Sequence, residues 1–519
     1  MENIIQTLRK NRSQTIMLAT LVVLFLSTLQ GMEPNDWVIT VLRGLAVASV
    51  TFLVASGFSL IFGLMDVLNL AHGTLFMIGA YVGWTAYVRP DTMLDLATPF
   101  ALFIAGLVLA PLWGNLLARA RVSNVGHILP WVIIILGLVV LAFGLTRYPI
   151  TAWDPAVYDK SPVVFGVKLD LGQTDLPAPV TAESAQIVLA MVGILAGSAL
   201  VALGIALSAM RQRRAAPARA AWKALGLALG LSILGLVLHL WNDALTASLV
   251  AAGTTWRFFL AMIVATLVGA GLGALMESTL IRPLYVRPIY QLMLTLGLGV
   301  IGREVVIAIW GRTQMQMPKP ALFNTIGKGC PAQTLWDALA NQCSTFYFME
   351  TRVRTYNEVF VFVMGVVVLI AVWMLLQRTR IGMIIRAGVQ DRAMVEALGI
   401  NVRQVFTFVF ALGVGLAALG GVLAGPAMGV SDDMGEGLLL SALIALAIGG
   451  LTSFPGAAAG SLLVGLLQQF IVKYGQIGIA LPFLAQPFKP TPPLVPASTL
   501  LLMVIVLLIM PNGLFGRKE

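Results

Sequence analysis

Residues 63–73 read Gly63-Leu64-Met65-Asp66-Val67-Leu68-Asn69-Leu70-Ala71-His72-Gly73 and interrupt an otherwise apolar region. Val38–Phe62 before this stretch is long and apolar enough to cross a bilayer, and Leu75–Trp84 continues the same character after it. Lipid offers no hydrogen bonds, so polar groups at membrane depth have to be satisfied by protein or water. The stretch therefore predicts a broken helical hairpin that lines a pathway. A short cytosolic turn between two ordinary helices is the competing interpretation.

The composition places the chain among integral membrane proteins. Of its 519 residues, 59% are hydrophobic and 11% are charged, whereas a soluble domain carries about 25% charged residues. The net charge of +10 suggests nucleic acid as a partner. However, the Lys and Arg residues lie in short loops beside apolar segments, as the positive-inside rule describes. We therefore expect membrane lipid around the chain and no nucleic acid.

The basic residues also predict which side of the membrane each loop faces. Three of them precede the first apolar run, Thr15–Leu29, namely Arg9, Lys10 and Arg12. This run lacks the small-residue cleavage site of a signal peptide, so we expect a retained first helix that starts in the cytosol. Later basic loops fall on the same side, including the final Arg517 and Lys518, which predicts that both termini are cytosolic.

A second interruption lies at Gly449-Gly450-Leu451-Thr452-Ser453-Phe454-Pro455-Gly456. Pro455 removes a backbone donor and the glycines loosen the helix, so Gly437–Leu451 and Ala457–Ile471 are predicted to form a kinked hairpin. Paired interrupted segments are the best sequence indication of a transport pathway. We therefore predict an all-α, polytopic integral membrane helix bundle with two broken helical hairpins. The predicted pathway residues are Asp66, Asn69, His72, Gly73, Thr452, Ser453 and Pro455.

His72 is a possible proton carrier or metal ligand. The other two histidines are His127 and His239, and no Cys or Asp residues cluster with them, whereas a structural metal site needs about four such ligands. We predict no metal site, and a helix-capping or pore-lining hydrogen bond for His72.

Small residues recur every fourth position at Gly413, Ala417, Gly421 and Gly425, which predicts one face where a neighbouring helix packs closely. Arg303 and Glu304 lie within the apolar segment Ile289–Trp310, and such charges are expensive against lipid, so each is expected to have a partner inside the protein.

Cys330 and Cys343 share the polar loop Gly311–Tyr356, which the predicted sidedness places outside. We expect a disulfide between them, because an oxidising compartment permits one.

Arg378–Arg403 is the one sizeable cytosolic segment predicted in the C-terminal half. Val389–Leu398 has the pattern of a short amphipathic helix, and Gly399 follows as a C-terminal cap. Such a helix is suited to docking another protein, or to lying on anionic lipid.

Several motifs, in order, resemble those of branched-chain amino acid ABC transporter permeases. The resemblance covers roughly residues 43–88 and 258–517. Its motifs are residues 63–73 followed by Met77-Ile78-Gly79-Ala80-Tyr81, then Glu277 with Ile281-Arg282-Pro283-Leu284, then Arg380-Ile381-Gly382-Met383 through Leu398-Gly399-Ile400-Asn401, then residues 449–457, and finally Pro511-Asn512-Gly513-Leu514-Phe515-Gly516.

The resemblance implies one membrane subunit of an ATP-driven importer in a bacterial inner membrane. Its partners would be a second permease subunit, cytosolic ATP-binding subunits and an extracytoplasmic solute-binding protein. Segment 378–403 would couple to the ATPase, through Arg386, Asp391, Arg392, Glu396, Leu398 and Gly399. The chain contains no Gly-x-x-x-x-Gly-Lys-Ser/Thr loop, so we expect it to be no enzyme, to bind no cofactor and to leave ATP hydrolysis to a separate polypeptide.

Alternatives remain open for the substrate and the energy source. Urea or short amides are the nearest alternative substrates to branched-chain amino acids. An ion-coupled secondary transporter would instead use Asp66, His72, Arg303 and Glu304 for protons or sodium.

The segment between the two resembling parts sets this chain apart. Residues 89–255 are predicted to be an insertion of about four extra membrane helices and an acidic outer loop, flanked by residues 1–88 and a permease core of residues 256–519. The insertion is expected to be a peripheral decoration; an extra contact with a binding protein or lipid is the alternative.

Overall fold

The structure, a computed structural model, describes most of the chain. It describes residues 20, 23, 25–29, 31–119, 127–151, 176, 178, 182–211, 218–285, 287–327, 329–390, 392–479 and 486–516. Most of the predicted first helix, most of the acidic outer loop, Asp391 and the last three residues lie outside these ranges.

The described residues are mostly helical, which confirms the predicted fold class. Ten helices among them are long and apolar enough to cross a membrane, and two shorter apolar helices accompany these. Two short strands, β1 (Thr345–Phe348) and β2 (Thr351–Arg354), form an antiparallel hairpin. The chain is therefore a multi-pass membrane protein.

The chain divides into two compact units. The first unit comprises Met1–Trp84 with Thr254–Glu519, and the second comprises Thr85–Gly253. The limits of the second unit lie close to those of the predicted segment 89–255. The main helices of the first unit are α3 (Pro34–Met65), α4 (His72–Val88), α13 (Gly253–Met276), α14 (Pro288–Trp310), α16 (Val361–Arg378), α17 (Arg380–Gln390), α18 (Arg392–Ala397), α19 (Val402–Met428), α20 (Met434–Gly449), α21 (Phe454–Ile477) and α22 (Leu494–Ile509).

The second unit packs through small residues. It contains α5 (Pro90–Val108), α6 (Ala110–Arg119), α7 (Leu129–Arg147), α10 (Ser184–Arg211), α11 (Ala218–Leu240) and α12 (Asn242–Ala251). A Cβ added to Gly197 of α10 would lie 2.5 Å from the backbone nitrogen of Leu141 in α7. Helices associate in lipid through such close approaches of their backbones.

The first predicted break lies inside the helix bundle. α3 ends at Met65, and the cap residue Asp66 that follows it has a left-handed backbone with φ of 55°. The backbone nitrogen of Leu70 donates to Oγ1 of Thr295 at 3.2 Å, and this hydroxyl donates to the carbonyl of Leu68 at 3.4 Å. Thr295 is buried and lies two turns into α14. A neighbouring helix therefore satisfies two of the backbone groups of the break.

The predicted small-residue face of α19 is confirmed. A Cβ added to Gly413 would lie 2.6 Å from the carbonyl oxygen of Gly57 in α3, and one added to Gly421 would lie 2.2 Å from the carbonyl oxygen of Phe76 in α4. Ala417, between them, is completely buried. α19 therefore joins both arms of the broken hairpin.

The second break is a tight turn between α20 and α21. Ser453 caps α21 by accepting a hydrogen bond from the backbone nitrogen of Gly456 at 3.1 Å. Pro455 lies in the first turn of α21, where no backbone donor is needed, so it starts the helix and does not kink one. The C-terminal segment covers this turn, since the backbone nitrogen of Leu514 donates to the carbonyl of Ile448 at 2.8 Å.

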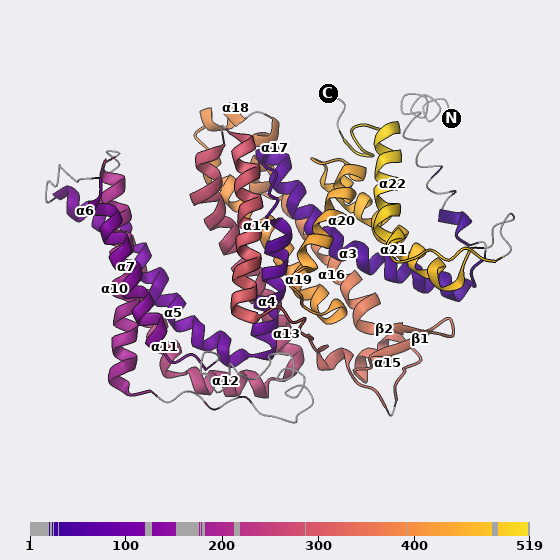
Figure 1. Cartoon of the computed structure of the whole chain (residues 1–519), viewed down its shortest axis with the longest axis horizontal. Coiled ribbons are helices and arrows are strands. Elements are labelled where there is room, and N and C mark those ends of the chain that lie inside the picture. The colour runs from indigo at the N-terminus through magenta and orange to yellow at the C-terminus, as the bar shows by residue number, and fades with distance from the viewer. Residues whose placement is uncertain are drawn as a thin grey trace. The chain divides into compact units, whose positions relative to one another are not determined.

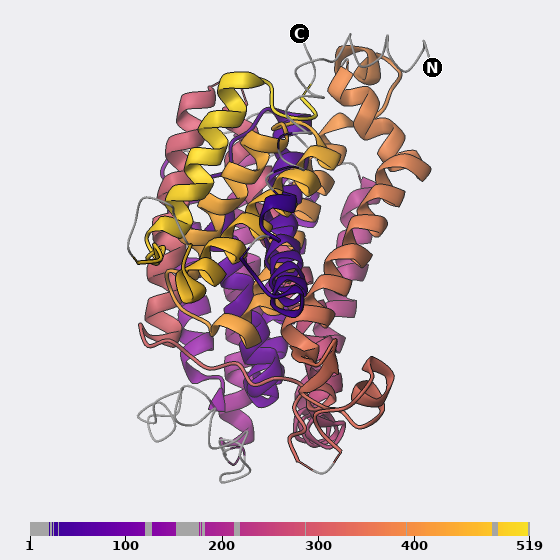
Figure 2. The ribbon, with the colours of Figure 1, turned by 90° about the vertical axis from the view of Figure 1, so that its right-hand side faces the viewer.

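The first unit has two distinct ends (Figures 1 and 2). The strands and α15 (Leu335–Ala340) form one end, called the hairpin end below, whereas α17 and α18 lie at the opposite end. The predicted helix over residues 389–398 coincides with the end of α17 and with α18, and Asp391 between these two lies outside the described residues. Gly399 does end α18, with φ of 79° and its backbone nitrogen bonded to the carbonyl of Glu396.

Candidate functional site

The first unit contains a cavity of roughly 760 Å³. Its walls come from segments far apart in the sequence: α3, the end of β2, the π-helix η5 (Thr355–Phe360), the start of α16, the end of α19 with the loop that follows it, α20 and α21. This volume lies within the range of about 300–1,000 Å³ that is usual for small-molecule sites. The cavity is therefore the strongest candidate for a substrate site in the described part of the chain.

A salt bridge between α3 and η5 contributes to the cavity wall. Nε of Arg43 donates to Oε1 of Glu358 at 2.8 Å, and the side chains are 40% and 3% exposed respectively. The other carboxylate oxygen of Glu358 accepts from the backbone nitrogen of Arg354. A buried carboxylate is stable only when it is paired in this way. The pair fixes one cationic group at the edge of the cavity.

The rest of the lining combines aliphatic and neutral polar groups. The aliphatic residues are Ala46, Val47, Val50, Val361, Leu423, Ala424, Ala427 and Leu438. A polar contact joins two of the lining helices, where Nε2 of Gln468 lies 3.3 Å from Oγ of Ser441. A surface of this kind fits a small ligand that has charged groups and an aliphatic part.

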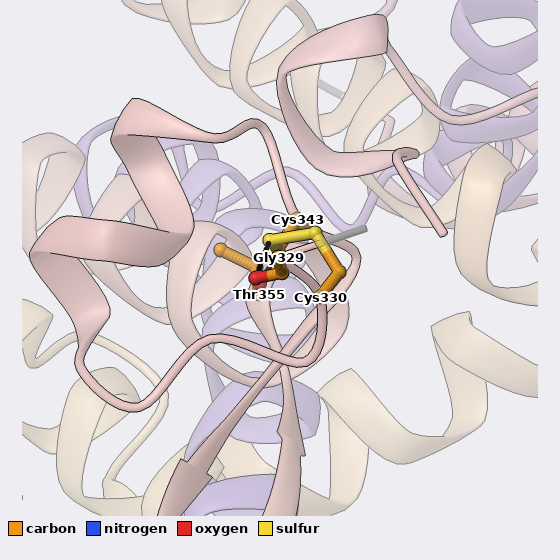
Figure 3. The surroundings of a disulfide bond; sticks show 4 residues. All are labelled: Gly329, Cys330, Cys343 and Thr355. Atoms are coloured by element: carbon orange, nitrogen blue, oxygen red, sulfur yellow. Dashed lines mark hydrogen bonds between the residues drawn. A yellow bond between two sulfur atoms is a disulfide. The ribbon is translucent and has the colours of Figure 1, made fainter. Parts of the chain in front are cut away.

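The hairpin end holds η5 in place. Cys330 and Cys343 are joined by a disulfide in the structure, and Oγ1 of Thr355 donates to the carbonyl of Cys343 at 2.8 Å (Figure 3). Thr355 is the first residue of η5 and Glu358 is the fourth. The disulfide loop therefore supports the segment that carries the acidic partner of Arg43.

Replacing Cys343 with serine is expected to loosen this support. A cross-link with a sequence separation of 13 residues constrains the unfolded chain by about 3 kcal/mol. We expect a lower midpoint of thermal unfolding and faster proteolysis within residues 311–354. Cys330→Ser should behave in the same way, and reducing agent should change neither variant further. A wild-type cleavage rate that is unchanged by reducing agent would contradict this prediction.

Charges near the cavity influence the pKa of Lys319, which lies in the loop between α14 and the strands. Burial and the positive charge of Arg354 lower the pKa of Lys319, while the negative charge of Glu358 raises it. Arg354 and Glu358 both line the cavity. The hairpin end therefore brings several charged groups close to one another.

The predicted pathway residues do not line this cavity. Asn69 and His72 are buried in the core, with Nε2 of His72 3.2 Å from the carbonyl of Val54. Val54 lies one turn beyond Val50 on α3, and neither Val54 nor His72 lines the cavity. Gly73 lies directly against Gly435 of α20. Three further predicted residues are exposed, namely Asp66, Thr452 and Pro455, and Ser453 is the N-cap of α21.

The two predicted intramembrane charges behave differently. Nη2 of Arg303 lies 3.0 Å from Oδ2 of Asp432, and its Nη1 lies 3.2 Å from Oε1 of Glu436. Glu304 is exposed and makes no ion pair in the described part of the chain, contrary to the expectation of an interior partner. Adjacent helical positions point about 100° apart, which explains why Arg303 reaches acidic partners and Glu304 does not.

The predicted coupling residues lie on or next to α17 and α18. Arg386, Glu396, Leu398 and Gly399 are exposed. Arg392 is the first residue of α18, and Asp391 lies outside the described residues. At least four of the six predicted coupling residues therefore lie at the surface of the protein.

Sequence reasoning missed the charged cavity residues Arg43, Glu358 and Asp433. Arg43 follows the apolar start of α3, and Glu358 precedes the apolar α16. A charge at the edge of a membrane span is a functional signal when it faces the protein interior. The sequence carries that signal at both positions, but the interior partner lies 315 residues away.

Comparison with known proteins identifies the family. The family model described as branched-chain amino acid transport system / permease component matches residues 40–221 and 187–511. Both ranges extend into residues 89–255, so the match does not mark that segment as an insertion, and the insertion stays a prediction. No solved structure gave a significant match.

Curated relatives match over part of their length. The high-affinity branched-chain amino acid transport system permease protein BraD of Pseudomonas aeruginosa is 34% identical over 33% of this chain and 51% of its own. LivH of Escherichia coli K12, with the same descriptive name, is 29% identical over 32% of this chain and 49% of its own. The chain thus spans about half the length of these relatives. Since the family model matches more than half of the chain, the chain belongs to the family of branched-chain amino acid transport system permease components.

Proposed function

We propose that the chain is the membrane-spanning permease subunit of an ATP-driven importer for branched-chain or related amino acids. One observation carries this proposal, namely the cavity, which combines charged groups at its edge with aliphatic walls. An amino acid with a branched aliphatic side chain has both kinds of surface. The relatives whose names include branched-chain amino acid transport support the same substrate class.

The orientation in the membrane follows from the two ends of the first unit. A disulfide persists in an oxidising compartment, which favours an extracytoplasmic hairpin end. Arg378, Arg380 and Arg386 lie at the opposite end, as the positive-inside rule expects for the cytosol. In this orientation the cavity is next to the extracytoplasmic side and both termini are cytosolic.

The remaining components of the importer lie on other polypeptides. The chain has no phosphate-binding loop of the Gly-x-x-x-x-Gly-Lys-Ser/Thr type, so nucleotide would bind to separate cytosolic subunits and this chain would hold no cofactor. A second permease subunit would complete the pathway, and an extracytoplasmic binding protein would deliver the amino acid to the hairpin end.

α17 and α18 are proposed to dock the ATP-binding subunits. Four apolar side chains are exposed there, at Ile381, Met383, Met394 and Leu398. Exposed apolar groups beside charged ones are typical of a protein interface. Leu398 is 71% exposed and directly precedes Gly399, whose left-handed backbone ends α18.

Replacing Leu398 with aspartate is expected to weaken docking of the ATP-binding subunits at least tenfold, because interface anchors contribute about 2 kcal/mol or more. Copurification of these subunits and substrate-dependent ATP hydrolysis measure the effect. Ile326→Asp is the matched control, since Ile326 is 85% exposed but lies at the hairpin end. Equal ATPase recovery with both variants would exclude docking at α18.

Reconstitution tests the proposed function as a whole. The chain, its ATP-binding subunits, a second permease and the binding protein are placed in liposomes, and uptake of labelled leucine is followed. We expect uptake that requires ATP and persists when ionophores remove the ion gradients. Uptake that ignores ATP, or that ionophores abolish while ATP is held constant, would overturn the proposal.

A further inference from the structure

Arg43 has hydrogen-bonding capacity that the salt bridge does not use. Its contact with Glu358 involves Nε, and neither Nη1 nor Nη2 has a hydrogen-bond partner within the described residues. A guanidinium group presents its nitrogens in a planar fork that binds a carboxylate through two parallel hydrogen bonds. Arg43 thus lines the cavity with donors available for an anionic group.

Asp433 supplies an opposite charge to the same cavity. One of its carboxylate oxygens, Oδ1, accepts from Oγ of Ser431 at 2.6 Å. The nearby Arg303 pairs with Asp432 and Glu436 instead, and no ion pair to Asp433 occurs within the described ranges. Asp433 is exposed and lines the cavity, so it can receive a cation without first losing a partner.

Asn357 adds a neutral acceptor. It lies between Arg354 and Glu358 on the cavity wall, and its Oδ1 atom is buried without any hydrogen-bond donor. An unsatisfied buried acceptor costs about 1–3 kcal/mol. A donor brought by a ligand would remove that cost.

We propose that this cavity binds the transported amino acid directly, as a zwitterion. Arg43 holds the α-carboxylate through Nη1 and Nη2, and Asp433 with Oδ1 of Asn357 holds the α-ammonium group. Glu358 is a positioning residue, because it orients Arg43 through Nε. This inference rests on the proposed function and goes beyond it, since it gives the permease a recognition site of its own.

The aliphatic part of the cavity completes the recognition. Val47, Val50 and Leu423 offer apolar contacts to a branched side chain, and burying each methylene contributes about 0.8 kcal/mol. The charged groups then recognise what all α-amino acids share, while the aliphatic wall favours those with apolar side chains. A ligand that lacks either charge would leave Arg43 or Asp433 unpaired.

A single introduced cysteine can report occupancy of the cavity. The chain has two cysteines, and both form the disulfide. Ala427 is exposed and lines the cavity, so Ala427→Cys in the full-length protein would be the one free thiol. We expect leucine to slow its labelling by a hydrophilic maleimide. Equal concentrations of 4-methylpentanoate, which lacks the amino group, or of 3-methylbutylamine, which lacks the carboxylate, should protect at least tenfold less.

Variants in the Ala427→Cys background assign the roles. Arg43→Met and Asp433→Asn should each raise the leucine concentration for half protection at least tenfold, and Arg43→Lys should restore part of the loss. Lys473→Met is the matched control, because Lys473 pairs with Asp36 at 2.7 Å between α21 and α3, two helices that line the cavity, yet neither residue lines it. It should leave protection unchanged.

Two outcomes would overturn the inference: protection that is equal with the one-charge analogues, or protection that survives both Arg43→Met and Asp433→Asn. Unfolding midpoints equal to that of the parent show that the variants are folded. The assay needs neither ATP nor partner subunits. If leucine protects the thiol but ATP-driven uptake fails in the reconstituted system, the proposed function is wrong and the binding inference stands. If uptake succeeds but leucine does not protect the thiol, only the inference is wrong.

Discussion

Replacing Gly57 with alanine is expected to lower the free energy of unfolding by about 1–3 kcal/mol, and replacing it with leucine is expected to prevent most of the protein from folding. A Cβ at this position would lie 2.3 Å from the carbonyl oxygen of Gly413. This obstacle is backbone, so it cannot rotate away, and α3 and α19 would have to separate. Both arms of the broken hairpin pack on α19, and the separation would disturb the whole core of the first unit.

Gly271 offers the matched control for this substitution. It also lies within a membrane helix, α13, but a Cβ added there would meet nothing within 4 Å. Alanine is the better helix former by up to about 1 kcal/mol, so Gly271→Ala should be neutral or slightly stabilising. Thermal unfolding in detergent and the monodisperse fraction on gel filtration measure both variants. Equal midpoints for Gly57→Ala and Gly271→Ala would show that the contact between the two glycines does not hold α3 and α19 together.

The sequence predicted those features of the fold that depend on local pattern. Apolar runs located the membrane helices, and the polar groups of residues 63–73 located the break between α3 and α4, because membrane helices must satisfy their own backbone. The four-residue spacing from Gly413 to Gly425 located the close contact of α19. The interruption over residues 449–456 located the turn between α20 and α21, although Pro455 lies in the first turn of α21 and not before it.

The cavity could not be predicted in the same way, because it is a property of tertiary packing. Its lining comes from several segments that are distant in the sequence, and the 315 residues between Arg43 and Glu358 leave no local pattern. The predicted pathway residues lie outside this cavity for a related reason. A break in a membrane helix has to satisfy its own polar groups first, and Oδ1 of Asn69 accepts from the backbone nitrogen of Ala71 at 3.2 Å. Polar side chains at a break therefore form hydrogen bonds with the backbone of the break, and these bonds occupy groups that could otherwise face a pathway.

Glu277 forms the most deeply buried ionic cluster in the described part of the first unit. Its carboxylate is fully buried and accepts from Nη2 of Arg282 at 2.7 Å, from Oγ1 of Thr407 at 2.6 Å and from the hydroxyl of Tyr285. Glu277 begins the π-helix η2 (Glu277–Ile281) and Thr407 lies in α19. The cluster therefore ties the end of α13 to the helix that leads away from α18, the proposed docking site.

Replacing Arg282 with methionine is expected to lower the free energy of unfolding by about 3–5 kcal/mol, because it leaves the buried carboxylate of Glu277 without its cation. The double variant Arg282→Met/Glu277→Gln should recover much of this loss, since no uncompensated charge then remains. Arg287→Met is the matched control, because Arg287 is exposed and its guanidinium lies 5.7 Å from the ring of Tyr290; a surface change of this kind costs within about 0.5 kcal/mol. Unfolding midpoints in detergent compare the three. If the single and double variants were equally unstable, the loss would come from packing of the Arg282 side chain, and the charge of Glu277 would not be what holds α13 to α19.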